Sequence, residues 1–299
     1  MRHSRKERIK AILLVLPTFV AMIIFIYGFI GFTGYASLSN WNQLKPDFSF
    51  VGLRNYITLF KNQRFIIDLK NTFTFTTLFL ISAILIGFLL AVLLDQNIWG
   101  EGIFRNIYLF PMALSYIVTG VVWRWLLSPG TQITGPLGVN MLFEMMGLDF
   151  LKSGWFTDPD IGIRAVVIAA TWQTAGYIMA LYLAGMRAIS DDLREAARVD
   201  GASEFQIYLR IIIPLLRPIT LSAVIILGHI SLKIYDLVVS MTGPGIGFST
   251  DVPALFMFDT TFRGNRFAQG ASIAMVLLIL VAILIVPYLI SSNKRQVER

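Results

Sequence analysis

The sequence predicts an all-α integral membrane protein with six transmembrane helices. Of its 299 residues, 56% are hydrophobic and only 14% are charged, whereas soluble domains carry about 25% charged residues. The apolar residues are gathered into long runs, and a helix of ~20 such residues crosses the ~30 Å hydrocarbon core of a bilayer. Lipid is therefore the expected environment of most of the chain.

Six segments are long enough to span a membrane, and together they predict a single transmembrane domain over residues 1–299. The predicted spans are residues 11–35, 72–94, 107–127, 163–186, 219–241 and 268–290. The first follows a basic segment, as in a signal peptide, but its apolar stretch exceeds the usual ~7–15 residues and no A-x-A-like cleavage site follows it. It is therefore expected to be retained. Prolines at positions 17, 111 and 287 can kink their spans.

The distribution of Lys and Arg predicts that both termini are cytoplasmic. With the N-terminus inside, the inner segments hold 14 basic residues in 63 positions, and the outer segments hold 8 in 97. The inner density is more than twice the outer one, as the positive-inside rule requires. The predicted location is therefore a membrane that the chain crosses several times, with both ends on its cytoplasmic side.

Composition argues against several other classes of protein. A net charge of +7 can indicate nucleic-acid binding, but cytoplasmic loops of membrane proteins account for it more simply, and no nucleic-acid partner is expected. The chain has no cysteine, and its only histidines are His3 and His229. Neither a metal site built from cysteine or histidine nor a cysteine nucleophile is therefore expected.

The longest inner loop, residues 190–218, predicts a helix–turn–helix elbow. Ser190 and the two following aspartates form an N-cap and an acidic first turn. Gly201 then supplies the backbone freedom of a sharp turn. The second helix should carry an apolar stripe. From periodicity alone, this stripe can pack on the chain's own helix ends, on lipid headgroups or on another protein. The stripe consists of Phe205, Tyr208, Leu209 and Ile212.

A motif in this loop resembles the EAA loop of bacterial ABC importer permeases. That pattern is EAA, three residues, G, nine residues, I, one residue, LP. Here Glu195-Ala196-Ala197 is followed at the same spacings by Gly201 and by Ile211-x-Ile213-Pro214, with Ile213 as the only departure. Further segments resemble the sugar-transporting, maltose-permease-like branch, and the last of them most resembles permeases for glucose or mannose. These segments are FVGLRNY, RNIYLFPMALSYIVTGVVWRWLL and YDLVVSMTGPG.

The resemblance implies a multi-pass subunit of the bacterial cytoplasmic (inner) membrane that transports a sugar, of the glucose or mannose type or a small oligosaccharide, but catalyses no covalent reaction. Its expected partners are a second homologous permease, two cytoplasmic ATPase subunits and a periplasmic or lipid-anchored sugar-binding protein. The chain has no G-x-x-x-x-G-K-[ST] phosphate loop, so it is expected to bind no cofactor itself, with ATP and Mg on the ATPase. The resemblance assigns the ATPase contact to Glu195, Ala196, Ala197, Asp200, Gly201, Phe205 and Pro214.

Polar residues within the predicted spans are candidates for the substrate pathway, because charges there are costly. His229, Lys233 and Asp236 are spaced to share one helical face. They are predicted to line a cavity. The alternative prediction is that Lys233 and Asp236 form a structural ion pair. The family's pocket also implies Tyr235. Other candidates offer the amide, hydroxyl and aromatic groups that a sugar needs; they are Gln173, Tyr177, Trp172 and Thr119.

Three alternatives stay open at this point. An ABC permease could carry a polyol or glycerol phosphate, although a phosphate should need additional arginines in the cavity. A proton-coupled carrier could use His229, Lys233 and Asp236 as a relay, but such carriers often show internal repeats, and none is found. An intramembrane enzyme would need a nucleophile–base pair or a metal cluster.

Overall fold

The computed structural model describes residues 5–96 and 98–297, with side chains over residues 13–96 and 98–287. The regular elements in these ranges are all helices, apart from two isolated bridges between Ser39 and Phe50 and between Thr131 and Gly135. This confirms the all-α prediction. His3 and the outermost residues of the two predicted terminal segments lie outside the described residues.

Four of the described helices are long and apolar enough to cross a membrane, and counting each of two bent helix pairs as one span gives up to six. The four are Leu13–Ser37, Gln63–Leu94, Gly162–Arg187 and Phe267–Pro287. The first combines α1 (Arg5–Met22), a π-helical turn (Ile23–Gly28) and α2 (Phe29–Ser37), and the others are α4, α8 and part of α15 (Phe267–Val297). These spans lie close to the predicted ones.

The third predicted span, residues 107–127, is not one helix. Helix α5 (Glu101–Leu109) ends in a 3₁₀ turn (Phe110–Ala113), and α6 (Tyr116–Leu126) follows at an angle of 100°. Pro111 has no N–H for helix hydrogen bonding. Ser115 is extended and its hydroxyl accepts a hydrogen bond from the Val118 N–H at 3.3 Å. An N-cap therefore starts a new helix inside the predicted span.

The fifth predicted span, residues 219–241, is also interrupted. Helix α12 (Arg217–Leu232) is followed by non-helical residues 233–235 and then by α13 (Asp236–Met241). Upstream of α12, a 64° bend separates it from a segment made of α10 (Glu204–Ile207), a π-helical turn (Tyr208–Ile212) and α11 (Ile213–Leu215). The sequence stays apolar through the break after α12 and through the bend before it, so the hydropathy of the sequence did not reveal either.

The chain packs as two compact units, each described by itself. Unit 1 contains residues 1–62 and 256–278, and unit 2 contains residues 63–255 and 279–299. In unit 1, buried Asn55 on α3 (Arg54–Phe60) donates hydrogen bonds to the carbonyls of Ser37 and Ser39, at 2.9 and 2.8 Å. The Trp41 ring stacks on Phe267 with centroids 4.7 Å apart.

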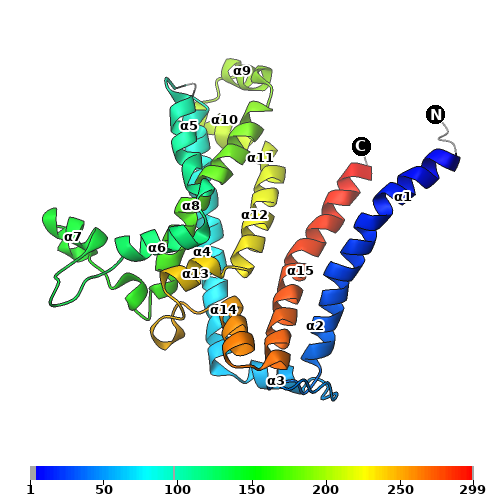
Figure 1. Cartoon of the computed structure of the whole chain (residues 1–299). Helices are drawn as coiled ribbons and strands as arrows, with labels where there is room; N and C mark the ends of the chain where they lie inside the picture. The colour runs from blue at the N-terminus through cyan, green and yellow to red at the C-terminus, as the bar shows by residue number, and fades with distance from the viewer. Residues whose placement is uncertain (1–4, 97, 298–299) are drawn as a thin grey trace. The chain divides into compact units, whose positions relative to one another are not determined.

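The core of unit 2 is formed by α4 and α8, which run side by side (Figure 1). Helix α8 is the most buried candidate span, with 72% of its most apolar window inside the structure. The two helices approach closely at Gly87, where an added Cβ would lie 2.7 Å from the Cβ of Ile178. Small residues allow such close approaches between membrane helices, where van der Waals packing drives association.

The remaining described helices are short. They are α7 (Gly138–Met145), α9 (Asp191–Val199) and α14 (Pro253–Phe258), with 3₁₀ turns at Asp149–Leu151, Trp155–Thr157 and Ile246–Phe248 and a π-helical turn at Asp259–Arg263.

We expect the Gly87→Leu substitution to separate α4 from α8 and to destabilise the protein by about 1–3 kcal/mol, the usual cost of overpacking. Thermal unfolding of the detergent-purified protein measures this. The control is Gly31→Leu on α2, where an added Cβ meets no described atom within 4 Å. Equal melting temperatures for the two variants would contradict the importance of this contact.

Candidate substrate pathway and coupling surface

A small cavity lies where the fifth predicted span is interrupted, between α12 and α13. Its volume is about 200 Å³. It is lined by Tyr116, His229, Ile230, Lys233, Ile234, Tyr235, Asp236 and Leu237. The structure therefore brings together four of the predicted pathway residues and adds Tyr116 from α6.

The geometry of this convergence differs from the predicted one. His229 lies in the last turn of α12, Lys233 follows that helix and Asp236 begins α13, so the three charged or titratable side chains do not share the face of one helix. Lys233 and Asp236 are both exposed, and none of the ion pairs described in the structure joins them. Irregular backbone at membrane depth is tolerated where it lines a cavity or is buried in protein. The interruption itself thus forms the cavity wall.

Helix α4 supports this wall from behind. The Thr76 hydroxyl donates a hydrogen bond to the Ser231 hydroxyl at 2.9 Å. Ser231 is fully buried and donates in turn to the Gly228 carbonyl at 2.8 Å. These bonds fix the last turn of α12 directly before the non-helical residues.

Gln173 supports the other interrupted span. Its amide nitrogen donates to the Leu114 carbonyl at 2.8 Å, at the bend between α5 and α6. That carbonyl belongs to an extended residue, and a buried carbonyl without a partner would be costly. Gln173 and Thr119 are both buried, and the Gln173 Oε1 and Thr119 Oγ1 atoms have no hydrogen-bond partner among the described residues. Tyr177 is partly buried against the apolar core.

Trp172 lines a second, larger cavity. This cavity has a volume of about 580 Å³ between α4, α5 and α8, and its walls are mostly apolar. Trp172 meets Trp123 edge to face, with ring centroids 5.9 Å apart. The hydroxyls of Ser82 and Thr171 on the wall bond to each other at 2.7 Å. The predicted pathway residues are thus divided between two cavities and the helix packing.

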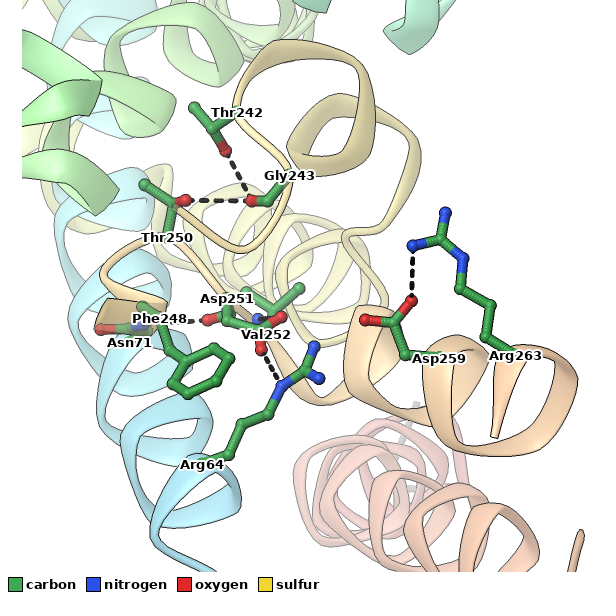
Figure 2. Close-up of polar contacts among 10 residues, drawn as sticks. All are labelled: Arg64, Asn71, Thr242, Gly243, Phe248, Thr250, Asp251, Val252, Asp259 and Arg263. Atoms are coloured by element: carbon green, nitrogen blue, oxygen red, sulfur yellow. Dashed lines mark hydrogen bonds and ion pairs between the residues drawn. The ribbon is translucent and has the colours of Figure 1, made fainter. Parts of the chain in front are cut away.

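The sequence did not point to a buried ion pair that holds the Gly- and Pro-rich loop after α13. Figure 2 shows Arg64 reaching Asp251, with Nε and Oδ2 2.5 Å apart. Asp251 is fully buried and the Arg64 side chain is 19% exposed. The Asn71 amide donates to the carbonyls of Phe248 and Asp251, at 2.8 and 3.0 Å. Burial raises the pKa of the Asp251 carboxyl, and Arg64 opposes that rise.

Within the same loop, the Thr242 and Thr250 hydroxyls both donate to the Gly243 carbonyl, at 2.9 and 3.0 Å (Figure 2). Arg64 and Asp251 are 187 positions apart in the chain, and no local sequence pattern connects them.

The elbow at residues 190–218 contains two helical segments joined by a turn. Helix α9 ends at Val199, and Gly201 directly beyond its cap residue Asp200 has a φ of +80°, which suits glycine. The Ala202 N–H bonds back to the Ala197 carbonyl at 2.9 Å, as in a glycine-terminated helix end. Ser203 and Gln206 form a capping box that starts α10.

The elbow exposes an acidic and apolar surface. Glu195, Ala196, Asp200 and Gly201 are exposed, Ala197 is buried and Pro214 is partly buried in α11. The predicted stripe is divided, because Phe205 (75% exposed) and Leu209 point outward whereas Ile212 is buried and Tyr208 is partly buried. The inward side is taken by Ile207 and Ile212, five residues apart across the π-helical turn. The outward surface consists of Glu195, Val199, Phe205 and Leu209.

Comparison with known proteins identifies the family. Residues 83–298 match the family described as binding-protein-dependent transport system inner membrane component. The chain belongs to this family. A probable ABC transporter permease of Pyrococcus horikoshii is 41% identical over 283 residues, covering 95% of both chains. A xylose/arabinose import permease of Haloferax volcanii is 35% identical, over 93% of this chain and 86% of the relative.

The fold agrees with a solved transporter. A chain of the bacterial alginate ABC transporter, in complex with an alginate pentasaccharide-bound periplasmic protein, matches with a TM-score of 0.78 and 24% identity over 93% of each chain. Together with the family match, this confirms the predicted ABC permease fold and the multi-pass inner-membrane location. As a permease subunit, this ABC-permease family member is not itself an enzyme.

We expect Asp251→Asn to destabilise this permease by about 1–3 kcal/mol, because asparagine loses the charge that pairs with Arg64, while the buried Asp68 carboxyl nearby still interacts with Arg64. The control is Asp149→Asn, which breaks a pair with Lys152 in which the aspartate is 67% exposed and should cost at most about 1 kcal/mol. Thermal unfolding in detergent measures both. A melting temperature equally reduced by both substitutions would contradict the assigned role of the buried pair.

Proposed function

We propose that this permease forms, with a second homologous permease, the translocation pathway for a sugar delivered by an extracytoplasmic binding protein. Two cytoplasmic ATPase subunits, which bind ATP and Mg, would drive alternating access. The observation that carries the proposal is the polar and aromatic cavity at the interruption between α12 and α13, in a chain whose family is binding-protein-dependent. The import functions named for the xylose/arabinose and alginate relatives support a carbohydrate substrate.

The chemistry of the cavity suits a neutral sugar. Tyr116 and Tyr235 offer aromatic surfaces for the apolar faces of a sugar ring, and His229, Lys233 and Asp236 offer donors and acceptors for its hydroxyls. A glycerol phosphate would favour guanidinium groups, and none of the residues lining this cavity is an arginine. A glucose- or mannose-type sugar or a small oligosaccharide remains the specific prediction, with a polyol as the alternative. Gln173, Tyr177, Trp172 and Thr119 remain predicted pathway residues.

The outward surface of the elbow is proposed to dock into an ATPase cleft. Phe205, Leu209 and Val199 present exposed apolar side chains. The exposed Glu195, one turn before Val199 on α9, can pair with a basic residue of the cleft. Docking on an ATPase requires this loop to be cytoplasmic, which agrees with the orientation predicted from Lys and Arg for both termini.

The proposal is tested with the reconstituted complex and a panel of glucose, mannose, xylose, arabinose and disaccharides. At least one sugar should stimulate ATP hydrolysis. Asp236→Asn should then raise its half-saturating concentration about 10- to 100-fold, the equivalent of one hydrogen bond to a charged group. The exposed Asp160→Asn is the control and should change nothing. A panel in which no sugar stimulates hydrolysis would refute the sugar assignment.

Gly201→Pro should weaken coupling strongly, because proline cannot adopt the φ of +80° at this position. We expect sugar-stimulated ATP hydrolysis to fall at least about fivefold, a typical coupling effect. Gly201→Asn is the matched control, because asparagine tolerates the left-handed region, and it should retain most of the stimulation. Full stimulation in the proline variant would show that this turn is not needed for coupling.

A further inference from the structure

Three polar side chains meet beneath the elbow at the end of α4. Asp95 follows the last residue of α4, and its Oδ2 accepts hydrogen bonds from Arg194 Nη1 at 2.8 Å and from the Tyr208 hydroxyl at 3.2 Å. The side chains of Asp95 and Arg194 are only 5% and 15% exposed. Arg194 lies on α9 and Tyr208 in the π-helical turn after α10, so one carboxylate contacts both arms of the elbow.

The position of Asp95 is unfavourable without these partners. Its N–H continues the helical bonding of α4 to the Ala91 carbonyl at 2.9 Å, and the partial negative charge at a helix C-terminus disfavours an acidic side chain. Removing a carboxylate from water is also costly. Arg194 compensates both effects, and its Nη2 donates in addition to the Met186 carbonyl at 3.2 Å, in the last turn of α8.

Neighbouring side chains stabilise the contact of Asp95 with Arg194 and Tyr208. Gln96 donates to the Tyr208 hydroxyl at 3.1 Å, and water has little access to screen the ion pair. Beneath it, buried apolar side chains of α4, α8 and the elbow belong to one packed cluster. They include Leu94, Met186, Ala197, Ile207, Ile212 and Leu216.

Helix α4 connects this contact with the cavity. The elbow is already joined through the chain to α8 and α12, and Asp95 adds α4. From Asp95 to Thr76 the helix is unbroken, a length of about 28 Å at 1.5 Å per residue. Thr76 then bonds to Ser231 at the end of α12, directly before the cavity residues. A rigid helix therefore runs from the elbow to the proposed sugar site.

We propose that Asp95 is a positioning residue for energy coupling, which fastens the elbow to α4 through Arg194 and Tyr208. Movement of the elbow by the ATPase then displaces α4 together with α8 and α12. The inference rests on the proposed function, since it assumes that an ATPase moves the elbow.

The test compares Asp95→Asn with wild type in the reconstituted complex. Asparagine keeps an acceptor for Tyr208 but loses the charge opposite Arg194. We expect the complex to assemble and hydrolyse ATP, while the ATP consumed per sugar imported rises at least about fivefold. The control is Glu101→Gln, which breaks the more exposed Arg187–Glu101 pair between α5 and α8 (2.8 Å) and should leave this ratio unchanged.

A second variant and a second readout separate the outcomes. The exchange Asp95→Arg with Arg194→Asp should restore most of the ratio if the ion pair matters, even where a single variant assembles poorly. Hydrogen exchange of the α9 amides should be faster in Asp95→Asn whatever the substrate. An unchanged ratio in Asp95→Asn, unchanged α9 exchange, or a failure of the charge exchange to restore coupling would overturn the inference. Absence of ATP-driven sugar import by wild type would instead refute the proposed function.

Discussion

The close contact of α4 with α8 is the constraint on which the rest of unit 2 depends. In a bilayer, water cannot satisfy a backbone carbonyl exposed by a broken helix. Within the described residues, the third and fifth predicted spans are each interrupted, and each of these interruptions is held by one of the two packed helices. Gln173 of α8 bonds to Leu114 at the first, and Thr76 of α4 supports Ser231 at the second. Gly87 allows α4 and α8 themselves to pack closely, so the two supporting helices belong to one core.

Much of this arrangement could be predicted from local sequence. Apolar runs located the unbroken helices, and the spacing from Glu195 to Pro214 identified the family that the comparisons confirmed. The turn at Gly201 was also correctly expected, because glycine is the residue that a positive φ favours. In each case the responsible signal lies within about one helix or one loop.

Other features depend on contacts between distant residues. The non-helical residues 233–235 include Lys233 but no glycine or proline, and the sequence on both sides is apolar. The sequence therefore predicted one continuous span. In the sequence, Asp95 lies in a predicted loop and nothing near it indicates a partner. Its partner Arg194 is 99 positions away in the chain and contacts it only in the folded protein. Four of the residues that line the candidate cavity, His229, Lys233, Tyr235 and Asp236, were among the predicted pathway residues. Its geometry was not predicted, because its wall is an interruption and not a helical face.

That interruption has a consequence for how such a permease can diversify. Lys233 and Asp236 are exposed and lie outside the packed cluster of buried side chains, so exchanging them leaves the α4–α8 contact and the helix supports intact. Surface substitutions of this kind usually change stability by no more than about 0.5 kcal/mol. Under the proposed function, mutations at these positions would change which sugar is transported, while the helix packing and the surface that docks on the ATPase stay unchanged.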